Sequence, residues 1–159
     1  MMVCVSGGFD PLHYGHIQLF KHARALGDNL VVLLNSDDWL KRKKGFVFMP
    51  FQERKQIIEA CRYVDSVVPV VDKDDTVCRT LSIIEPDIFA NGGDRTRSTT
   101  THQEQEVCEA LGIDMKWDVS GEETRHVHGV DYIRRLILTY IDGDVSAIWL
   151  RGIAGKKWN

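Results

Sequence analysis

The sequence predicts an α/β fold with a doubly wound, parallel sheet of five strands and helices on both faces. Short apolar runs alternate along the chain with segments whose apolar residues recur at helical spacing. The run Asn29–Asn35 is almost entirely apolar, which is typical of a strand covered on both faces. Strands that alternate with helices in this way favour a parallel sheet between two helical layers.

The five expected strands are short and rich in apolar residues. They are Met2–Ser6, Asn29–Asn35, Ser66–Val71, Asp87–Ala90 and Ile113–Trp117. The first ends at a Gly-Gly pair. Pro69 lies in the third and predicts an edge position, because proline cannot donate a hydrogen bond within a sheet.

The expected helices follow these strands. The first has apolar residues at helical spacing from Ile17 to Leu26 and stops at Gly27-Asp28. The others are Pro50–Tyr63, with Ile57, Ile58 and Cys61 on its inner side, Thr76–Ile84, His102–Leu111 and Val130–Ile141. The segment Asp37–Lys44 ends in a basic cluster, and Gly45–Pro50 is predicted to be a loop.

Length and charge narrow the class of protein. The chain has 159 residues and 43% hydrophobic residues, enough for one compact domain, expected over residues 1–141 and followed by a docked or flexible tail, 142–159. The net charge of -3 argues against a protein that coats nucleic acid or an anionic membrane. No apolar run approaches the roughly 18–20 residues that span a bilayer.

The cysteines point to a reducing compartment. They lie far apart, without a Cys-x-x-Cys pair, at Cys4, Cys61, Cys78 and Cys108. This spacing predicts free thiols in a cytoplasmic protein, with neither a disulfide framework nor a zinc site. The N-terminus has no basic region before a long apolar stretch, so no secretory signal is expected.

Two loops are expected to form the site, because ligands of doubly wound sheets bind beyond the carboxyl ends of the strands, where strand order reverses. The second, after the fourth strand, carries Asn91–Asp94, and the first is SGGFDPLHYGH (6–16). Gly7 and Gly8 allow a sharp turn and close approach of a ligand, and free N–H groups at a helix start attract phosphate. His13 and His16 share one face of the first helical turn. Chemistry alone leaves open a phosphate site and a polar turn with incidental histidines.

The pattern G-x-F-D-P-x-H-x-G-H after a first strand resembles the His-x-Gly-His signature of the nucleotidyltransferase superfamily. Residues 3–118 are similar to its cytidylyltransferase-like branch, which includes glycerol-3-phosphate cytidylyltransferase and the adenylyltransferase that acts on heptose 1-phosphate. The similarity continues through ARALGDNLVVLLNSDDWLKRKKG (23–45), FQERKQIIEACRYVDSVVP (51–69) and PDIFANGGDR (86–95). It implies a Rossmann-like fold.

The resemblance also implies a reaction, in which a phosphate monoester attacks the α-phosphate of CTP or ATP and releases pyrophosphate. His13 and His16 are then expected to contact the triphosphate and stabilise charge at the α-phosphate. Lys44, which would bind phosphate from the basic segment, and Arg125 are the other expected catalytic residues. The other implied nucleotide contacts are Gly7, Gly8, Phe9, Asp10, Lys41, Arg54, Asn91, Gly92, Gly93, Asp94 and Arg125. Mg²⁺ is expected to accompany the triphosphate, with ligands mainly from phosphate and water.

Each of these segments also has a plainer interpretation. Lys41–Lys44 could be a solvated basic patch, and Arg54 could form a surface ion pair with a nearby acid such as Glu53. The Asn91–Asp94 segment could be a simple turn. Its Gly-Gly-Asp sequence slightly favours ATP over CTP as the nucleotide, although the rest of the chain fits either.

The sequence departs from these relatives in one region. Where they carry Arg followed by a run of hydroxyl residues, this chain has GEETRHVHGVDYIRR (121–135). Arg125 can be matched, but His126 and His128 stand in place of the hydroxyls. These histidines could contact phosphate or substrate, bind a metal, or lie in an exposed loop. The departure raises an alternative function, a nucleotide-binding module that has lost catalysis. The resemblance further implies a homodimer.

Overall fold

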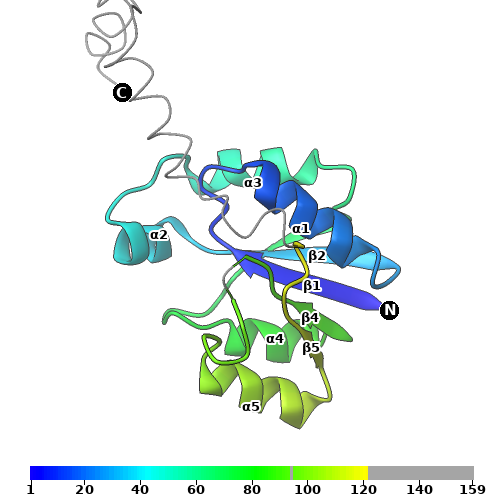
Figure 1. The fold of residues 1–159 in the computed structure, drawn as a ribbon. Coiled ribbons are helices and arrows are strands. Elements are labelled where there is room, and N and C mark those ends of the chain that lie inside the picture. The colour runs from blue at the N-terminus through cyan, green and yellow to red at the C-terminus, as the bar shows by residue number, and fades with distance from the viewer. Residues whose placement is uncertain (94, 122–159) are drawn as a thin grey trace, which may run out of the picture. The chain divides into compact units, whose positions relative to one another are not determined.

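The five strands form one parallel sheet. The computed structural model describes residues 1–93 and 95–121, and in these the strand order is β3-β2-β1-β4-β5 (Figure 1). The strands are β1 (Met2–Gly7), β2 (Asn29–Leu34), β3 (Ser66–Pro69), β4 (Ile88–Ala90) and β5 (Asp114–Lys116). All five predicted strands are present, and the predicted α/β architecture with a parallel sheet is confirmed.

The central strand is β1, and its register sets the position of the site. It pairs with β2 from Met2↔Asn29 to Gly7↔Leu34, and with β4 at Val3↔Ile88 and Cys4↔Phe89. Strand order therefore reverses between β1 and β4, so the loops that follow these two strands open at the same edge of the sheet. The edge position predicted for the strand with Pro69 is also confirmed, because β3 pairs only with β2 among the described strands.

Five helices connect the strands. They are α1 (Tyr14–Arg24), α2 (Asp37–Lys44), α3 (Phe51–Glu59), α4 (Cys78–Ile84) and α5 (His102–Leu111). The basic segment is thus a helix of its own. The Ser36 hydroxyl accepts a hydrogen bond from Trp39 N at 3.2 Å at its start, and Gly45 ends it with φ at 82°.

The helix predicted over Pro50–Tyr63 is shorter than expected, and the prediction that Ile57 lies on its inner side is wrong. It ends at Glu59, where the Ala60 N–H bonds back to Gln56 and Ile58. Ile58 is fully buried, but Ile57 is 41% exposed. The buried positions of α3 are Arg54 and Ile58, which are four residues apart, so the intervening Ile57 points away from the sheet.

The sheet separates two apolar cores. Alternate residues of β1 and β2 point to opposite faces, so Val3 and Val5 join one core while Cys4 joins the other. The first core includes Phe20 of α1 and Ile58 of α3, and the second includes Leu81 of α4 and Cys108 of α5. Figure 1 shows α1 and α3 on one side of the sheet and α4 and α5 on the other, as the doubly wound fold requires.

The four cysteines are free thiols, as predicted. Cys4 and Cys108 are buried, and Cys61 and Cys78 are partly exposed. None of the described helices is long and apolar enough to cross a membrane. Several predictions fall outside the described residues: the helix Val130–Ile141, the roles of Asp94, Arg125, His126 and His128, the domain boundary at residue 141 and the tail 142–159.

Candidate functional site

The first loop of the site, residues 7–16, leads from β1 into α1 and is tightly packed. A Cβ atom on Gly8 would lie 2.7 Å from Leu40 Cδ2 and 3.1 Å from Trp39 Cζ3, so α2 packs directly against this backbone. Phe9 takes a positive φ of 49°, and its buried ring makes an edge contact with the His16 ring at 4.9 Å between centroids. The loop is therefore shaped by close contacts and not by flexibility.

His13 and His16 start α1 and bond to its free backbone groups. His13 is the N-cap residue, and its Nδ1 accepts from Gly15 N at 3.2 Å, while His16 Nδ1 accepts from His13 N at 3.3 Å. Because Nδ1 is an acceptor in both rings, the proton of each neutral imidazole is on Nε2. The rings stack with centroids 3.7 Å apart, so two Nε2–H groups lie together at one helix N-terminus.

The surroundings keep His16 uncharged. Burial lowers the pKa of His16 to about 3, and the charges of His13 and Lys44 act in the same direction. At neutral pH His16 is therefore a neutral hydrogen-bond donor in a positively polarised place. An anion there gains the Nε2–H donors, the helix N-terminus and the nearby Lys44 charge together.

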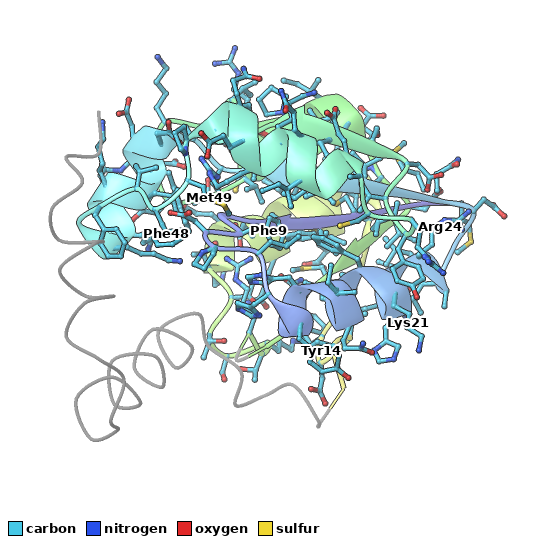
Figure 2. The ribbon with its side chains drawn as sticks, turned by 90° about the horizontal axis from the view of Figure 1, so that it is seen from above. Phe9, Tyr14, Lys21, Arg24, Phe48 and Met49 are labelled. Atoms are coloured by element: carbon cyan, nitrogen blue, oxygen red, sulfur yellow. The ribbon has the colours of Figure 1, made fainter. Side chains whose placement is uncertain are left out.

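Asp10 and Lys44 connect this loop to the segment after α2. The Lys44 ammonium donates to the Asp10 carbonyl at 2.9 Å. The Asp10 carboxylate accepts from Phe48 N and Met49 N, each at 2.7 Å. Figure 2 shows Phe9 near the middle of the molecule, with Phe48 and Met49 toward one end and Arg24 of α1 toward the other. Asp10 is thus committed to backbone groups, and its carbonyl places Lys44.

Arg54 lies beneath the same loop and is fully buried. Its Nη1 donates to the carbonyls of Gly8 at 2.7 Å and Asn35 at 2.8 Å, and its Nε donates to Met49 O at 2.9 Å. Its Nη2 pairs with the Asp37 carboxylate at 2.6 Å. The interpretation of Arg54 as a surface ion pair with Glu53 is therefore wrong, because the guanidinium is in the interior and its partner is Asp37.

The basic cluster of α2 is divided among three environments. Lys44 reaches the first loop, whereas Lys41 is 63% exposed and faces Asp38 at 3.7 Å. Arg42 and Lys43 instead pair with Asp75, at 3.6 and 3.2 Å. Of the two lysines proposed to bind phosphate, the structure brings only Lys44 to the histidines.

The second loop of the site, residues 91–101, follows β4 and contacts α1. A Cβ atom on Gly92 would lie 2.8 Å from Leu19 Cδ1 and 2.9 Å from Ser120 Oγ, so only glycine fits there. Gly93 N donates to Ser120 Oγ at 2.8 Å. Because Leu19 belongs to the helix that His13 starts, the structure brings the two predicted loops together at one edge of the sheet.

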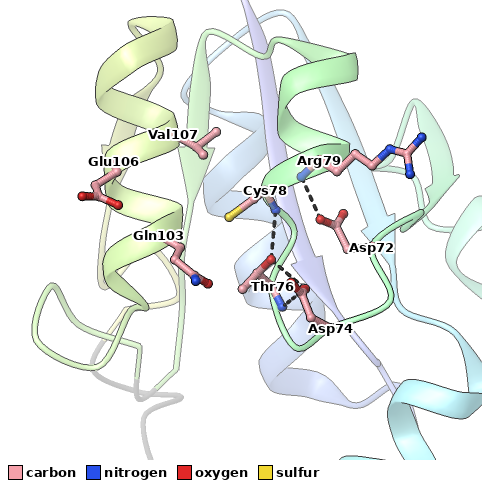
Figure 3. Close-up of a pocket in the computed structure, with 8 residues that line it drawn as sticks. All are labelled: Asp72, Asp74, Thr76, Cys78, Arg79, Gln103, Glu106 and Val107. Carbon is pink, nitrogen blue, oxygen red and sulfur yellow. Dashed lines mark hydrogen bonds between the residues drawn. The ribbon is translucent and has the colours of Figure 1, made fainter.

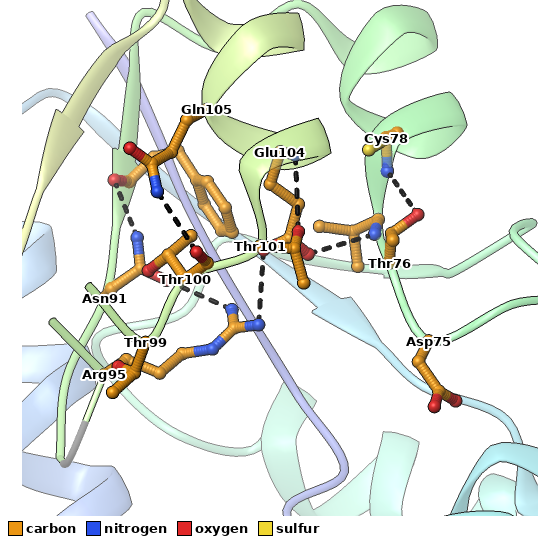
Figure 4. Close-up of polar contacts among 12 residues, drawn as sticks. Asp75, Thr76, Cys78, Asn91, Arg95, Thr99, Thr100, Thr101, Glu104 and Gln105 are labelled. Atoms are coloured by element: carbon orange, nitrogen blue, oxygen red, sulfur yellow. Dashed lines mark hydrogen bonds and ion pairs between the residues drawn. The ribbon is translucent and has the colours of Figure 1, made fainter. Parts of the chain in front are cut away.

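Arg95 and Glu104 were missed by the sequence analysis. Arg95 donates to the Asn91 side chain at 3.2 Å and pairs with the buried Glu104 carboxylate at 3.3 Å (Figure 4). Asn91 is itself buried. The signal that could have found Glu104 is its spacing, since Glu104 and Cys108 are four residues apart and are the two buried residues of α5.

A separate open depression of about 400 Å³ lies beside the starts of α4 and α5 (Figure 3). Its carboxylates are already bonded. Asp72 accepts from Arg79 N at 2.7 Å and Thr80 N at 3.0 Å, and Asp74 accepts from Thr76 N at 2.9 Å. These bonds satisfy backbone donors before and within the first turn of α4, so the acidic groups serve the fold. Among residues 1–93 and 95–121, no group of three or more His, Cys, Asp or Glu could hold a metal ion.

The fold and the site define an α/β protein in which two stacked histidines start a helix at the reversal of strand order. Residues 4–136 match the sequence model of the family described as cytidylyltransferase-like. The chain belongs to this family, as its resemblance predicted.

Three relatives of this chain have names that describe different activities. The chain is 36% identical to FAD synthase from Pyrococcus abyssi over 104 residues, which is 65% of this chain and 70% of the relative. It is 37% identical to glycerol-3-phosphate cytidylyltransferase from Staphylococcus aureus over 95 residues, 58% of this chain and 69% of the relative. It is also 37% identical to bifunctional protein HldE from Pectobacterium atrosepticum over 123 residues, 76% of this chain but only 23% of that longer protein.

A solved structure has the same fold. The lipopolysaccharide core biosynthesis protein from Thermoplasma volcanium superposes with a TM-score of 0.62 and 28% sequence identity. The superposition covers 74% of this chain and 93% of the other. The Rossmann-like arrangement of the sheet is therefore shared by a protein of known structure.

Proposed function

We propose that this protein is a nucleotidyltransferase that transfers the NMP group of CTP or ATP to a small phosphate monoester and releases pyrophosphate. The observation that carries the proposal is the stacked His13–His16 pair at the N-terminus of α1, with Lys44 beside it. Family membership supports the same class of reaction. A triphosphate is an anion that can use two imidazole donors, a helix terminus and a lysine at once.

The reaction is an in-line displacement. An oxygen of the acceptor phosphate forms a bond to the α-phosphorus, and the bond from that phosphorus to the oxygen bridging to the β-phosphate breaks. The bonding electrons leave with pyrophosphate. The chain contributes position and charge stabilisation, which dominate phosphoryl-group chemistry. His13 and His16 donate from Nε2 to oxygens of the α-phosphate, and Lys44 offsets the charge that grows on the leaving group.

The remaining site residues have supporting roles in this proposal. The Gly7–Gly8 backbone and Phe9 N–H face the triphosphate, and Asp10 fixes the turn through its bonds to the segment after α2. Arg54 acts through the carbonyl of Gly8, to which it donates. We also propose that Gly92, Gly93 and Asp94 contact ribose and base, that Arg125 binds phosphate, and that His126 and His128 contact phosphate or acceptor.

Mg²⁺ belongs to the same proposal. It would arrive with the triphosphate and take its ligands from phosphate oxygens and water, because the nearest carboxylate of the first loop, Asp10, is used by two backbone N–H groups. Bound Mg²⁺ neutralises charge on the phosphates. A homodimer and a cytoplasmic location remain predictions, the second supported by the free cysteines.

The test is pyrophosphate release. The protein is incubated with Mg²⁺, CTP or ATP, and one acceptor at a time from a panel of sugar, polyol and amino-alcohol phosphates, with FMN added because of the FAD synthase relative. We expect release with one nucleotide–acceptor pair and its loss in His16→Asn. Absence of release with every pair would count against catalysis.

The alternative is a nucleotide-binding module without catalysis, favoured by the missing hydroxyl run at residues 121–135. Thermal unfolding distinguishes the two. A module would show stabilisation by CTP or ATP without turnover of any acceptor, whereas turnover that His16→Asn abolishes would exclude it.

A further inference from the structure

The Arg95–Glu104 ion pair joins three segments beside the second loop of the site. The Glu104 side chain is 1% exposed, and its Oε2 lies 3.3 Å from Arg95 Nη2. Its Oε1 accepts from the backbone N–H of Val77, before α4, at 3.2 Å. One buried carboxylate thus connects α5, the segment before α4 and the second loop of the site (Figure 4).

Arg95 extends this connection to Asn91. Its Nη1 donates to Asn91 Oδ1 at 3.2 Å, while Asn91 Nδ2 faces the carbonyls of Phe89 at 3.4 Å and Lys116 at 3.5 Å. Asn91 N donates to Lys116 O at 2.8 Å. The side chain of Asn91 is therefore held on both sides, directly before the Gly92–Gly93 backbone.

The N-terminal cap of α5 does not require the Glu104 carboxylate. The Thr101 hydroxyl already caps α5, since it accepts from Glu104 N at 3.3 Å. An ion pair with a buried carboxylate adds little net stability compared with well-packed apolar side chains of the same volume, because the carboxylate loses its hydration. The pair is better explained by the one conformation that it enforces on the second loop.

We propose that Arg95 and Glu104 are a positioning pair for nucleotide binding, which holds Asn91 so that the Gly92–Gly93 backbone meets the nucleotide in a fixed conformation. This inference rests on the proposed function, in which the second loop contacts ribose and base. The pair acts on the conformation of Asn91, to which Arg95 donates. We therefore expect it to affect how tightly nucleotide binds and to leave the chemical step unchanged.

The test separates binding from chemistry in two variants, Glu104→Gln and Arg95→Met. We expect each to raise the KM and the dissociation constant for the nucleotide about tenfold, with kcat within about threefold of the unmodified protein. The double variant should be no worse than either single one, because both remove the same interaction. Arg95 is 33% exposed, so Arg95→Met remains informative if Glu104→Gln does not fold.

The matched control is Lys55→Met, which removes a more exposed ion pair with Glu59 on α3. It should leave the KM for nucleotide unchanged. If Arg95 and Glu104 served only the fold, the variants would have a lower thermal midpoint of unfolding. Their KM, measured at temperatures well below that midpoint, would be unchanged. That result, or a fall in kcat at constant KM, overturns the inference.

The same measurements keep this inference separate from the proposed function. Absence of nucleotide binding by the unmodified protein would overturn both. Normal turnover by the unmodified protein, with the KM of folded Arg95→Met also normal, would overturn only the role of the pair.

Discussion

The two loops of the site are held by different means. The first, residues 7–16, rests on a fully buried arginine, Arg54, whose four contacts include the carbonyls of Gly8 and Asn35. The second, residues 91–101, depends on Arg95, which is 33% exposed and reaches a buried carboxylate. The difference indicates that the first loop is part of the folding core, whereas the second can change without loss of the fold. Breaking the first should cost stability and chemistry, and breaking the second should mainly cost affinity.

Arg54→Met should have the largest effect on folding. It leaves the carbonyls of Gly8, Asn35 and Met49 without their donor and Asp37 without its partner. We expect a loss of about 3–5 kcal/mol in the free energy of unfolding, measured with urea. Lys55→Met on the same helix, which breaks a more exposed pair, should cost less than about 1 kcal/mol. Equal losses in the two variants would show that Arg54 is not a folding element.

His16→Asn should have the largest effect on chemistry. Loss of an Nε2–H donor at the α-phosphate should lower kcat by about 10²–10³, or roughly 3–4 kcal/mol of transition-state stabilisation. His13→Asn should act similarly, and asparagine preserves the N-cap of α1. His22→Asn, an exposed position on α1, is the control and should retain full turnover. Steady-state pyrophosphate release measures all three, and normal kcat in His16→Asn would contradict the assigned role.

The pKa of His16 predicts a loss of stability in acid. Its pKa is about 3 in the folded protein against 6.5 ordinarily, so below pH 6.5 the unfolded chain binds a proton that the folded chain does not. Stability is therefore complete above pH 6.5 and falls toward pH 3, by at most about 1.4 kcal/mol per pH unit. Urea denaturation at pH 6 and pH 4 should show a loss about 2 kcal/mol greater in the unmodified protein than in His16→Asn. Parallel pH profiles would exclude a neutral His16.

Two lysines of α2 test whether activity needs a positive charge at one defined position, against the first loop. Lys44→Met should lower kcat/KM about tenfold to a hundredfold, because Lys44 lies against the first loop. Lys41→Met should change kcat/KM less than about threefold, since that ammonium is exposed beside Asp38. Equal effects of the two substitutions would show that both lysines act only as parts of a general basic patch.

Thr100→Val should have the smallest effect and probes the second loop away from Asn91. The Thr100 hydroxyl donates to Thr96 O at 2.8 Å and accepts from Trp117 Nε1 at 3.2 Å. Its removal should lower the free energy of unfolding by about 1 kcal/mol. The KM for nucleotide should stay within a factor of about three, because the hydrogen bonds of Asn91 are preserved. A larger rise in KM would show that the whole loop, and not the Arg95–Glu104 pair, sets the affinity.

The order of elements was predictable because each one follows from local pattern. Apolar runs marked the strands, and the α5 bounds, His102–Leu111, were predicted correctly, since Gly112 takes a positive φ of 70° and ends that helix. The loops that carry Gly7–His16 and Asn91–Asp94 were expected to form the site because doubly wound sheets bind ligands where strand order reverses. The chemistry of His13 and His16 was also local, because both bond to the helix that they start.

The buried charges were not predictable in the same way. On both α3 and α5 a charged residue shares the buried face with one other residue, Arg54 with Ile58 and Glu104 with Cys108. Helical spacing assigned Ile57 to the interior, because apolar residues are usually the buried ones. The resemblance placed Arg54 at the site, and its plainer interpretation placed it on the surface. A buried charge is stable only with partners, and its partners come from distant segments.

The sequence by itself therefore determined the parallel sheet, the helix start with its two histidines and the family to which the chain belongs. Tertiary structure alone decided that Arg54 supports the Gly8 carbonyl, that Lys44 and not Lys41 reaches the first loop, and that Glu104 holds Arg95. The physical reason is the separation along the chain of the groups that interact. Strand pattern and helix capping depend on residues a few positions apart, whereas desolvated charges depend on groups that only the folded chain brings together.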